Sequence, residues 1–345
     1  MAVDYIGVEA ANSFVKVASV NEDLCYLNTS RRVESFEDTT GLTVYTYEGV
    51  RYVIGEEESA SSSARNDDRY SSAGYRTETI LAVAQLVKDG SEVVIGTGLP
   101  SEDYKNEENH EKVKRNLIGK HTVKINDIEK TFEVVRVYTP MQPIGSVVNR
   151  IYDYNLKIRK GMEWEKDARK LVIDIGFGTT DVCEAKGLRT IRYDGVQVGM
   201  MEANRIIKDE LTKQGARGIV SFLHMDSLLR SAEREYIKDE FTEKDVLSKV
   251  IIETGGKEYD IKDIMEQALE YTARTVMQRV DNLGYVLKDY DVVLFTGGSL
   301  LALHEYIKPY LTGVNTKAEQ GAQTANAKGY AKYAMIQDAK AGVLA

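Results

Sequence analysis

The feature that most constrains the fold is the stretch of residues 171–182, which reads LVIDIGFGTTDV. Its first residues are aliphatic and predict a strand buried in the middle of a sheet. The strand ends in a carboxylate, Asp174, and two positions later the chain turns to glycine. Small and hydroxyl residues and a second acid follow: Gly176, Gly178, Thr179, Thr180 and Asp181. We therefore expect a sheet strand that opens into a loop built for the close approach of a ligand.

The glycine loop has the chemistry of a phosphate cradle. Glycines let the backbone turn its N–H groups toward an anion, and the hydroxyls of Thr179 and Thr180 add neutral donors. Asp174 is suited to hold Mg2+ through water, because Mg2+ prefers oxygen ligands and keeps several waters. A tight β-hairpin turn would use the same glycines. Both interpretations stay open on these residues alone.

A second segment repeats this pattern near the start of the chain. Residues 5–20, YIGVEAANSFVKVASV, predict a strand, a loop and a strand. When the two segments are aligned, Glu9 falls on Asp174, and Lys16 falls on Asp181 seven residues later. A unit that recurs about half a chain apart predicts two similar halves with a ligand between them. Lys16 would supply a positive charge for a phosphate.

Composition restricts the kind of protein. The 345 residues suffice for two domains, and 43% hydrophobic with 29% charged residues is ordinary for a globular chain. The net charge of −9 argues against direct nucleic-acid binding by the bulk of the chain. Cys25 and Cys183 are far apart and predict neither a zinc site nor a disulfide. The sequence has no signal segment and no apolar run of about 18 residues, so we expect a cytoplasmic protein without membrane contact.

Two helix starts carry further candidate residues. Gln142 stands just before a predicted helix, where its amide could orient a water by hydrogen bonding. The neighbouring prolines, Pro140 and Pro143, fit a simple helix start equally well. Gly199 precedes a helix expected over about residues 201–214. It could bring the helix N-terminus to a nucleotide or only mark the start of the helix.

Another glycine pair follows a strand late in the chain. Residues 291–300, DVVLFTGGSL, predict a buried strand that ends in Gly297 and Gly298. A base or ribose could lie flat against such a pair, because no side chain intervenes. Ser299 is expected to cap the helix that follows.

The remaining segments give weaker signals. Residues 56–74 are polar and serine-rich and predict an exposed loop. Helices are expected over most of residues 227–249, and also over 261–280, whose apolar face is expected in the core. A terminal helix is expected over residues 324–336.

The order of these segments resembles that of the actin and heat-shock ATPase superfamily, and within it the ParM-type plasmid-segregation actins. Residues 12–16 (NSFVK) look like the first phosphate loop, 174–181 like the second and 296–300 like the adenosine loop. Residues 97–100 (TGLP) and 325–330 (ANAKGY) are similar to stretches typical of ParM-like proteins. The resemblance covers nearly the whole chain. It implies an α/β, actin-like fold of two ribonuclease-H-like domains, with inserted subdomains, around a nucleotide cleft.

The resemblance also implies roles for the candidate residues. Gln142 and Asp174 would be catalytic: Gln142 would position the hydrolytic water, and Asp174 would hold Mg2+ through water, with Glu9 as a second metal residue. The nucleotide would be bound by Asn12, Ser13, Lys16, Gly176, Gly178, Thr179, Thr180, Gly199, Gly297, Gly298 and Ser299. Relatives usually have Asp at the position of Glu9, Gly at that of Ala11 and often Glu at that of Gln142. The acid of the first loop therefore reaches one methylene further in this chain.

By the same resemblance, residues 1–155 with a C-terminal helix of about residues 321–345 form one domain, and residues 156–320 form the other. The implied function is hydrolysis of ATP or GTP, with Mg2+, coupled to assembly into a dynamic filament of identical subunits. Such a filament would segregate plasmid DNA through a DNA-binding adaptor. The alternatives are a monomeric ATPase or kinase of the same fold, and a filament for cell shape or phage positioning.

Overall fold

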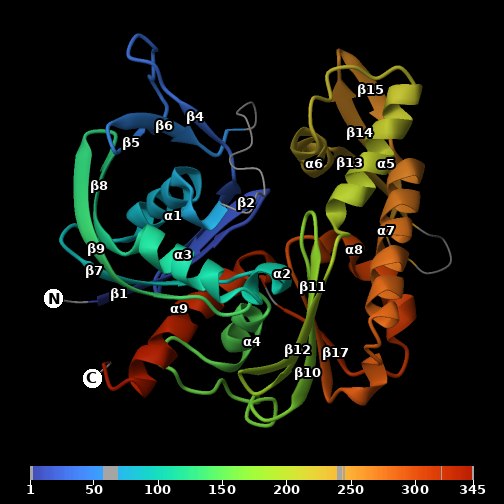
Figure 1. Cartoon of the computed structure of the whole chain (residues 1–345). Helices are drawn as coiled ribbons and strands as arrows, with labels where there is room; N and C mark the ends of the chain where they lie inside the picture. Colours follow the sequence, from blue (N-terminus) through green and yellow to red (C-terminus); the bar gives the residue numbers. More distant parts are fainter. Residues whose placement is uncertain (1–2, 57–68, 239–242, 244, 320, 344–345) are drawn as a thin grey trace.

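The computed structural model describes residues 3–56, 69–238, 243, 245–319 and 321–343. The chain forms two α/β halves that stand side by side, each with a smaller arm at the top of the view (Figure 1). Helices cover the sheets of both halves. This arrangement is the α/β architecture that the sequence predicts.

The first half is built on a nine-stranded sheet in the order β3-β2-β1-β7-β9-β8-β5-β6-β4. Its strands are β1 (Val3–Ala10), β2 (Phe14–Ala18), β3 (Asp23–Leu27), β4 (Ser30–Arg32), β5 (Tyr45–Tyr47), β6 (Val50–Ile54), β7 (Glu92–Thr97), β8 (Gly119–Ile125) and β9 (Ile128–Tyr138). The central strands β1, β7 and β9 run parallel. The outer strands β4, β5 and β6 rise into the arm of this half (Figure 1).

The second half is built on a five-stranded sheet in the order β12-β11-β10-β16-β17, and a separate three-stranded sheet in the order β13-β14-β15 forms its arm. The strands are β10 (Arg169–Ile175), β11 (Thr180–Lys186), β12 (Arg189–Val196), β13 (Glu233–Lys238), β14 (Asp245–Thr254), β15 (Lys257–Asp260), β16 (Val292–Thr296) and β17 (Thr316–Ala318). Here β10, β16 and β17 run parallel.

The helices are α1 (Ala73–Leu86), α2 (Ser101–Tyr104), α3 (Glu107–Leu117), α4 (Ile144–Ile151), α5 (Met200–Lys213), α6 (Phe222–Ser231), α7 (Lys262–Asn282), α8 (Leu300–Ile307) and α9 (Ala322–Lys340). Short 3-10 turns are η1 (Arg69–Ser71), η2 (Leu287–Asp289) and η3 (Lys308–Leu311). None of the helices in the described ranges combines the length and the apolar character needed to cross a membrane.

The two halves share one hairpin design, which accounts for the repeat in the sequence. Strands β1 and β10 each pair antiparallel with the following strand and parallel with a strand far along the chain. In the first hairpin Glu9 lies directly opposite Lys16, and in the second Asp174 lies directly opposite Asp181. Side chains opposite one another in a sheet point to the same face. The seven-residue spacing therefore brings each pair of charged residues together at the same place in its hairpin.

Helix α9 packs closely against β1, β7 and α4 because glycines let the backbones approach one another. A Cβ at Gly329 would lie 1.7 Å from the carbonyl oxygen of Gly145 in α4, and a Cβ at Gly7 in β1 would lie 1.8 Å from the carbonyl oxygen of Ala327 in α9. At Gly96 in β7 a Cβ would lie 2.2 Å from the carbonyl oxygen of Tyr330. Any side chain at these positions would force the helix away. The small residues of the 325–330 stretch are thus a packing requirement.

The strand–loop–strand prediction for residues 5–20 and the helices predicted after residues 142 and 199 and over residues 261–280 and 324–336 are confirmed, with ends that differ by a few residues. The prediction of helices across residues 227–249 is wrong beyond Ser231, because the chain continues as β13 and β14. Every residue of β13 is exposed, so this strand shows no apolar alternation to distinguish it from a charged helix. Its neighbour β14 is rich in β-branched residues and turns at Gly255 and Gly256, which is a hairpin signal.

The loop predicted over residues 56–74 falls partly outside the described residues, namely at 57–68. The prediction of exposure is wrong for Arg69 and Tyr70, which are buried in η1. Helix α1 already begins at Ala73, and the hydroxyl of Ser72 accepts a hydrogen bond from the backbone N–H of Tyr75. This serine is a helix cap rather than part of a serine-rich loop.

Candidate functional site

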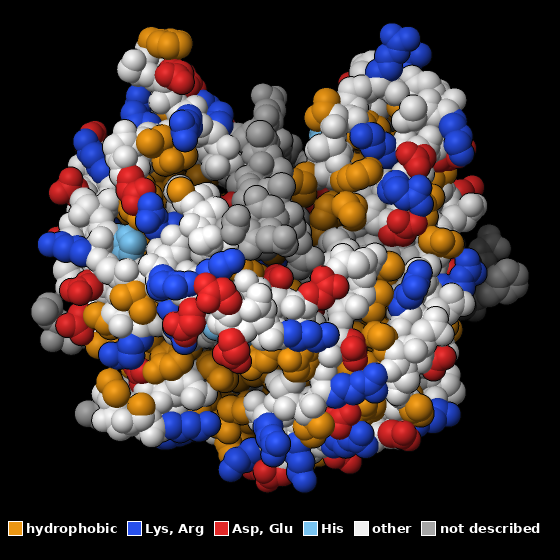
Figure 2. Space-filling view, viewed as in Figure 1, with side chains coloured by type: hydrophobic (Ala, Val, Ile, Leu, Met, Phe, Trp, Pro, Cys, Tyr) orange, Lys and Arg blue, Asp and Glu red, His pale blue; other side chains and the backbone are white. Residues whose placement is uncertain are grey.

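A cleft of about 570 Å³ lies between the two halves and is lined by residues of both. It runs from the ends of strands β1 and β10 toward the arm of the second half. Figure 2 shows the molecule hollowed between the two arms, with hydrophobic side chains on the inner side of the second arm. Most of the residues predicted to bind the nucleotide line this cleft: Glu9, Asn12, Ser13, Lys16, Gln142, Asp174, Gly176, Gly178, Thr179, Gly298 and Ser299.

On the side of the first half, Glu9 holds two other candidate residues at once. One carboxylate oxygen, Oε2, accepts a hydrogen bond from Lys16 Nζ at 3.0 Å, and the other, Oε1, accepts one from Gln142 Nε2 at 2.9 Å. Burial lowers the pKa of Lys16, but the charges of Glu9 and Asp174 outweigh burial, and the net shift is upward. Lys16 is therefore positively charged and available to an anion in the cleft.

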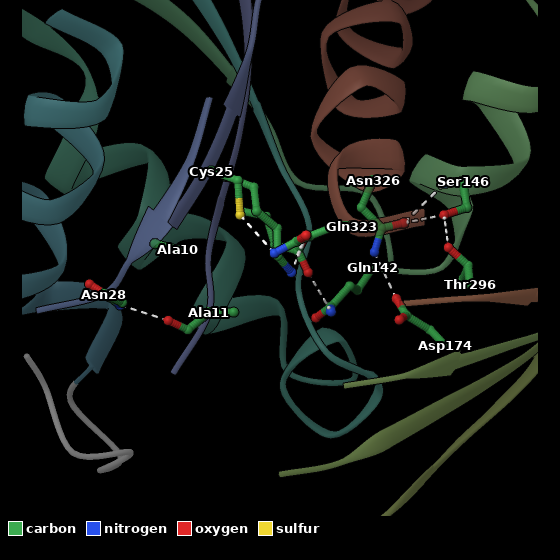
Figure 3. Close-up of polar contacts among 12 residues, drawn as sticks. Ala10, Ala11, Cys25, Asn28, Gln142, Ser146, Asp174, Thr296, Gln323 and Asn326 are labelled. Carbon is green, nitrogen blue, oxygen red and sulfur yellow. Dashed lines mark hydrogen bonds and ion pairs between the residues drawn. The ribbon is translucent and has the colours of Figure 1, made fainter. Parts of the chain in front are cut away.

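The backbone of Gln142 is fixed on both sides. Its N–H donates to the carbonyl of Leu99, 2.8 Å away, just beyond β7. Its carbonyl accepts a hydrogen bond from the hydroxyl of Tyr330 in α9 at 3.0 Å. The side chain reaches into the cleft from this anchored position, beside the start of α4 (Figure 3).

On the side of the second half, Asp174 is 3% exposed and accepts a hydrogen bond from Asn326 Nδ2 at 2.7 Å. Asn326 Oδ1 in turn accepts from the backbone N–H and the hydroxyl of Ser146, which also contacts the Thr296 hydroxyl at 2.6 Å (Figure 3). Burial, followed by the charge of Glu9, raises the pKa of Asp174 to about 7. Four elements, β10, α9, α4 and β16, thus converge on one carboxylate.

These carboxylates fit a magnesium site. Glu9 and Asp174 are both buried in the wall of the cleft, and the charge of Glu9 helps to raise the pKa of Asp174, so a divalent cation at this wall would favour the ionised form of Asp174. Within the described ranges no three His, Cys, Asp or Glu side chains gather closely enough to hold a metal ion alone. Mg2+ at this place would take its remaining ligands from water and from phosphate oxygens, as it usually does.

Three of the predicted residues stand behind the cleft and support its loops. The hydroxyl of Thr180 donates to the carbonyl of Val198 at 2.8 Å. A Cβ at Gly199 would lie 2.4 Å from the carbonyl oxygen of Gly176, and one at Gly297, whose φ is +96°, would lie 2.5 Å from Asp174 Oδ1. None of the three lines the cleft. They let the second loop, α5 and β16 pack against one another.

The first amides of α5 are already in use. The N–H groups of Met200 and Met201 donate to the carbonyls of Gly176 and Phe177, 3.2 and 2.7 Å away. The start of this helix therefore holds the second loop in place. Ser299 does the same from the other side, since its hydroxyl donates to the Gly176 carbonyl at 2.9 Å. The prediction that the side chain of Ser299 caps the following helix is wrong, because it makes no hydrogen bond to that helix.

The far end of the cleft is apolar. It is lined by side chains that include Met200, Leu229, Met265, Leu269, Leu301 and Tyr306. Of these, Met265 and Leu269 lie on the apolar face of α7, which was expected in the core; they belong to the core and also reach the cleft. A flat aromatic ring would bury its faces here.

Sequence reasoning missed the arginines at the edge of the cleft and Asn326. Arg230 of α6 lies 4.8 Å from the ring centroid of Phe14 in the first half, and its Nε donates to Asp226 at 2.7 Å. Arg69 and Arg234 also line the cleft. No local motif marks these positions, because α6 approaches β2 only in the folded chain. Asn326 lies within the ANAKGY stretch that resembles ParM-like proteins, but its hydrogen bond to Asp174 could not be predicted from that stretch.

Comparison with known proteins agrees with this geometry. Residues 13–145 match the family described as actin like proteins, N-terminal domain, and residues 172–308 match the archaeal actin homologue MreB-like C-terminal family. By sequence, no curated protein matches the chain. The first matched segment lies in the first half of the structure and the second in the second half.

Solved structures resemble nearly the whole chain. An archaeal actin homologue in complex with ADP is 17% identical, with a TM-score of 0.74, and the match covers 97% of this chain and 100% of that one. The apo psk41 ParM protein is 16% identical, with a TM-score of 0.71 and coverage of 99% and 100%. The Alp12 filament structure is 15% identical, with a TM-score of 0.66 and coverage of 98% and 99%. At these identities the likeness shows the fold, and together with the two family matches it places the chain among the actin-like proteins.

Proposed function

We propose that the cleft binds ATP or GTP with Mg2+ and hydrolyses it, and that the nucleotide governs assembly of the chain into filaments. The observation that carries the proposal is the joint position of Lys16, Gln142 and Asp174 on the wall of one cleft. A cation for phosphate, a neutral amide for water and a buried acid suited to Mg2+ face the same space. The archaeal actin homologue that binds ADP has the same fold, which supports nucleotide binding here.

Each of these residues has a separate role in the proposed hydrolysis. Lys16 and the amides of the two glycine-containing loops bind phosphate oxygens, and the apolar end of the cleft takes the base. The amide of Gln142 orients a water for in-line attack on the terminal phosphate by accepting a hydrogen bond from it, and it does not act as a base. Asp174 and Glu9 would hold Mg2+ through water, and the ion would supply positive charge beside the phosphates. Catalysis is then mainly positioning and electrostatic stabilisation.

Assembly and biological role follow by likeness to the neighbours. One neighbour is a filament, and another is a non-polymerisable mutant of a ParM, so some proteins with this fold polymerise. We propose that filaments of this chain weaken after hydrolysis and move plasmid DNA through a DNA-binding adaptor in the cytoplasm. The adaptor is required because the net charge of −9 disfavours direct contact with DNA. Residues 1–155 with 321–345, and 156–320, would be the two domains that close on the nucleotide.

The test is light scattering of the purified chain with phosphate release recorded alongside, first with Mg-ATP and then with Mg-GTP. We expect scattering to rise and then to fall as phosphate appears, with one nucleotide more effective than the other. Asp174→Ala should abolish turnover, and Gln142→Ala should slow it about 10-fold or more while nucleotide binding remains. Asp127→Ala is the matched control, because Asp127 is an exposed carboxylate outside the cleft.

The outcomes separate the alternatives. Turnover without scattering at any protein concentration reached would favour a monomeric ATPase. Addition of duplex DNA alone should leave the scattering unchanged, since the adaptor is absent. Gln142→Ala with the parent rate of phosphate release would show that its proposed role is wrong.

A further inference from the structure

Glu9 is placed to do more than contribute a charge to the cleft. It is 6% exposed, and each of its carboxylate oxygens accepts one hydrogen bond, from Lys16 and from Gln142. Lys16 lies opposite Glu9 in the β1–β2 hairpin, whereas Gln142 arrives from the loop before α4. One side chain therefore connects a residue suited to phosphate with a residue suited to water.

The contact with Gln142 fixes which end of the amide faces the cleft. A glutamine amide has a donor end, Nε2, and an acceptor end, Oε1, and a rotation of the amide exchanges them. A carboxylate can only accept, so Glu9 holds the Nε2 end. No described residue donates a hydrogen bond to Oε1, which leaves this oxygen free to accept one from a water. Without Glu9, both orientations would be populated, and in one of them Nε2 would face the water.

We propose that Glu9 is a positioning residue that holds the amide of Gln142 with its acceptor oxygen toward the attacking water. This inference rests on the proposed function, because it assigns Glu9 a part in that hydrolysis. The length of Glu9 matters. Aspartate would be one methylene shorter and would withdraw the carboxylate from Gln142 Nε2, Lys16 Nζ or both, each of which is at ordinary hydrogen-bond distance now.

The role of Glu9 toward Gln142 can be separated from its contact with Lys16 by kinetics. Loss of the Lys16 contact affects phosphate binding and therefore KM. Loss of amide orientation affects only the chemical step and therefore kcat at saturating Mg-nucleotide. A double-mutant cycle of Glu9→Asp and Gln142→Ala isolates the second effect.

We expect Glu9→Asp to lower kcat for phosphate release about 10-fold in the parent and less than about 2-fold in the Gln142→Ala background, because aspartate keeps the carboxylate for Mg2+ and the orientation of an absent amide cannot matter. Gln142→Glu should be slow, since it sets two carboxylates against each other. The exchange variant Glu9→Gln with Gln142→Glu should be faster than Gln142→Glu, because it restores an amide–carboxylate hydrogen bond. An equal loss from Glu9→Asp in both backgrounds would overturn the inference.

A second measurement does not depend on turnover. In nucleotide-free chain with 15N-labelled glutamine, the side-chain amide signal of Gln142 is the one missing in Gln142→Ala. We expect this signal to shift in Glu9→Asp and in Glu9→Gln, with both proteins folded by circular dichroism. An unchanged signal in both variants would overturn the inference even if the parent hydrolyses nucleotide. Absence of turnover in the parent with both ATP and GTP would instead refute the proposed function, and the amide signal would still decide the role of Glu9.

Discussion

Lys332 of α9 is buried without a charged partner at ion-pair distance among the described residues, which makes it a sensitive probe of the packing between α9 and α4. It is 0% exposed, and its Nζ lies 2.7 Å from Asn149 Oδ1 and 4.5 Å from the ring centroid of Tyr154. Burial is the main cause that lowers its pKa from 10.5 to about 7, and the charges of Arg159 and Lys328 add to the shift against the opposing charges of Glu319 and Asp153.

The lowered pKa of Lys332 determines how strongly its burial destabilises the folded chain and how this cost changes with pH. A pKa lowered from 10.5 to about 7 corresponds to a cost of about 5 kcal/mol for the folded state at a pH where the lysine is charged in both the folded and the unfolded chain. Between pH 7 and pH 10.5 the unfolded chain binds a proton that the folded chain does not, so the free energy of unfolding rises with pH across this range. Below pH 7 the cost is complete, and above pH 10.5 it vanishes.

We therefore expect Lys332→Met to stabilise the chain near neutral pH and not at high pH. The variant removes the cost of about 5 kcal/mol but leaves Asn149 Oδ1 without its donor, which costs about 1 kcal/mol. The net gain should be about 4 kcal/mol at pH 6.5 and should fall to zero or below by about pH 10.

Urea unfolding of parent and variant at pH 6.5, 8 and 10 measures this difference. Lys340→Met is the matched control, because Lys340 is exposed in the last turn of the same helix, and its effect should not vary with pH. A Lys332→Met chain that is less stable than the parent at pH 6.5 would refute the reasoning. So would a difference between variant and parent that stays constant from pH 6.5 to pH 10.

Other predictions follow from single contacts. Gly329→Ala should lower the free energy of unfolding by more than about 3 kcal/mol, since its Cβ would lie 1.7 Å from the carbonyl oxygen of Gly145. Gly74→Ala in α1 should be neutral or stabilising by up to about 1 kcal/mol, because the nearest atom to its Cβ would be 3.8 Å away. Thermal unfolding of the two variants and the parent measures the difference. Asp338→Asn should destabilise the chain by about 2–4 kcal/mol at pH 7, because the buried carboxylate accepts hydrogen bonds from Arg136, Tyr138 and Tyr5. Burial opposes ionisation of Asp338, but these partners lower its pKa overall, so the parent's advantage should shrink as the pH falls below the ordinary carboxyl range. Arg230→Ala should speed release of a fluorescent nucleotide in stopped flow, because it removes the contact with Phe14 across the cleft, while Lys208→Ala, which removes a cation–ring contact within the second half, should leave the release rate unchanged.

The sequence predicted correctly those strands and helices whose buried positions show as a run or a regular spacing of apolar residues. Strands β1, β10 and β16 are buried along most of their length, contain several aliphatic residues and are each followed at once by a small residue, Ala11, Gly176 or Gly297. Strand β13 has no buried residue, and its charged residues follow no period, so only its partner β14 defines it. Exposed edge strands of this kind depend on tertiary pairing that a local pattern does not record.

The residues of the candidate site likewise fall into those with a local sequence pattern and those placed only by tertiary packing. Residues on the loops of the two hairpins were predictable, because an acid and glycines at a strand end have a local signature. Asn326 contacts Asp174, and Arg230 reaches the cleft, from helices whose approach depends on packing, so neither contact could be read from a local pattern. The glycines at 199 and 297 were identified as ligand contacts, yet they hold backbone against backbone. A glycine that a ligand needs and a glycine that a neighbouring loop needs look alike in a sequence.

The difference between the two hairpins explains how a repeated unit yields an asymmetric site. Both hairpins place two charged residues opposite each other, but the first pairs Glu9 with Lys16 and the second pairs Asp174 with Asp181. The first pair is compensated and leaves a cation available to an anion. In the second, Asp181 accepts a hydrogen bond from the backbone N–H of Ser101, which leaves Asp174 as the acid with unmatched charge in the cleft. The hairpins thus differ both at Glu9 and Asp174 and at Lys16 and Asp181, and this difference gives the cleft a cation beside one strand end and a buried acid beside the other.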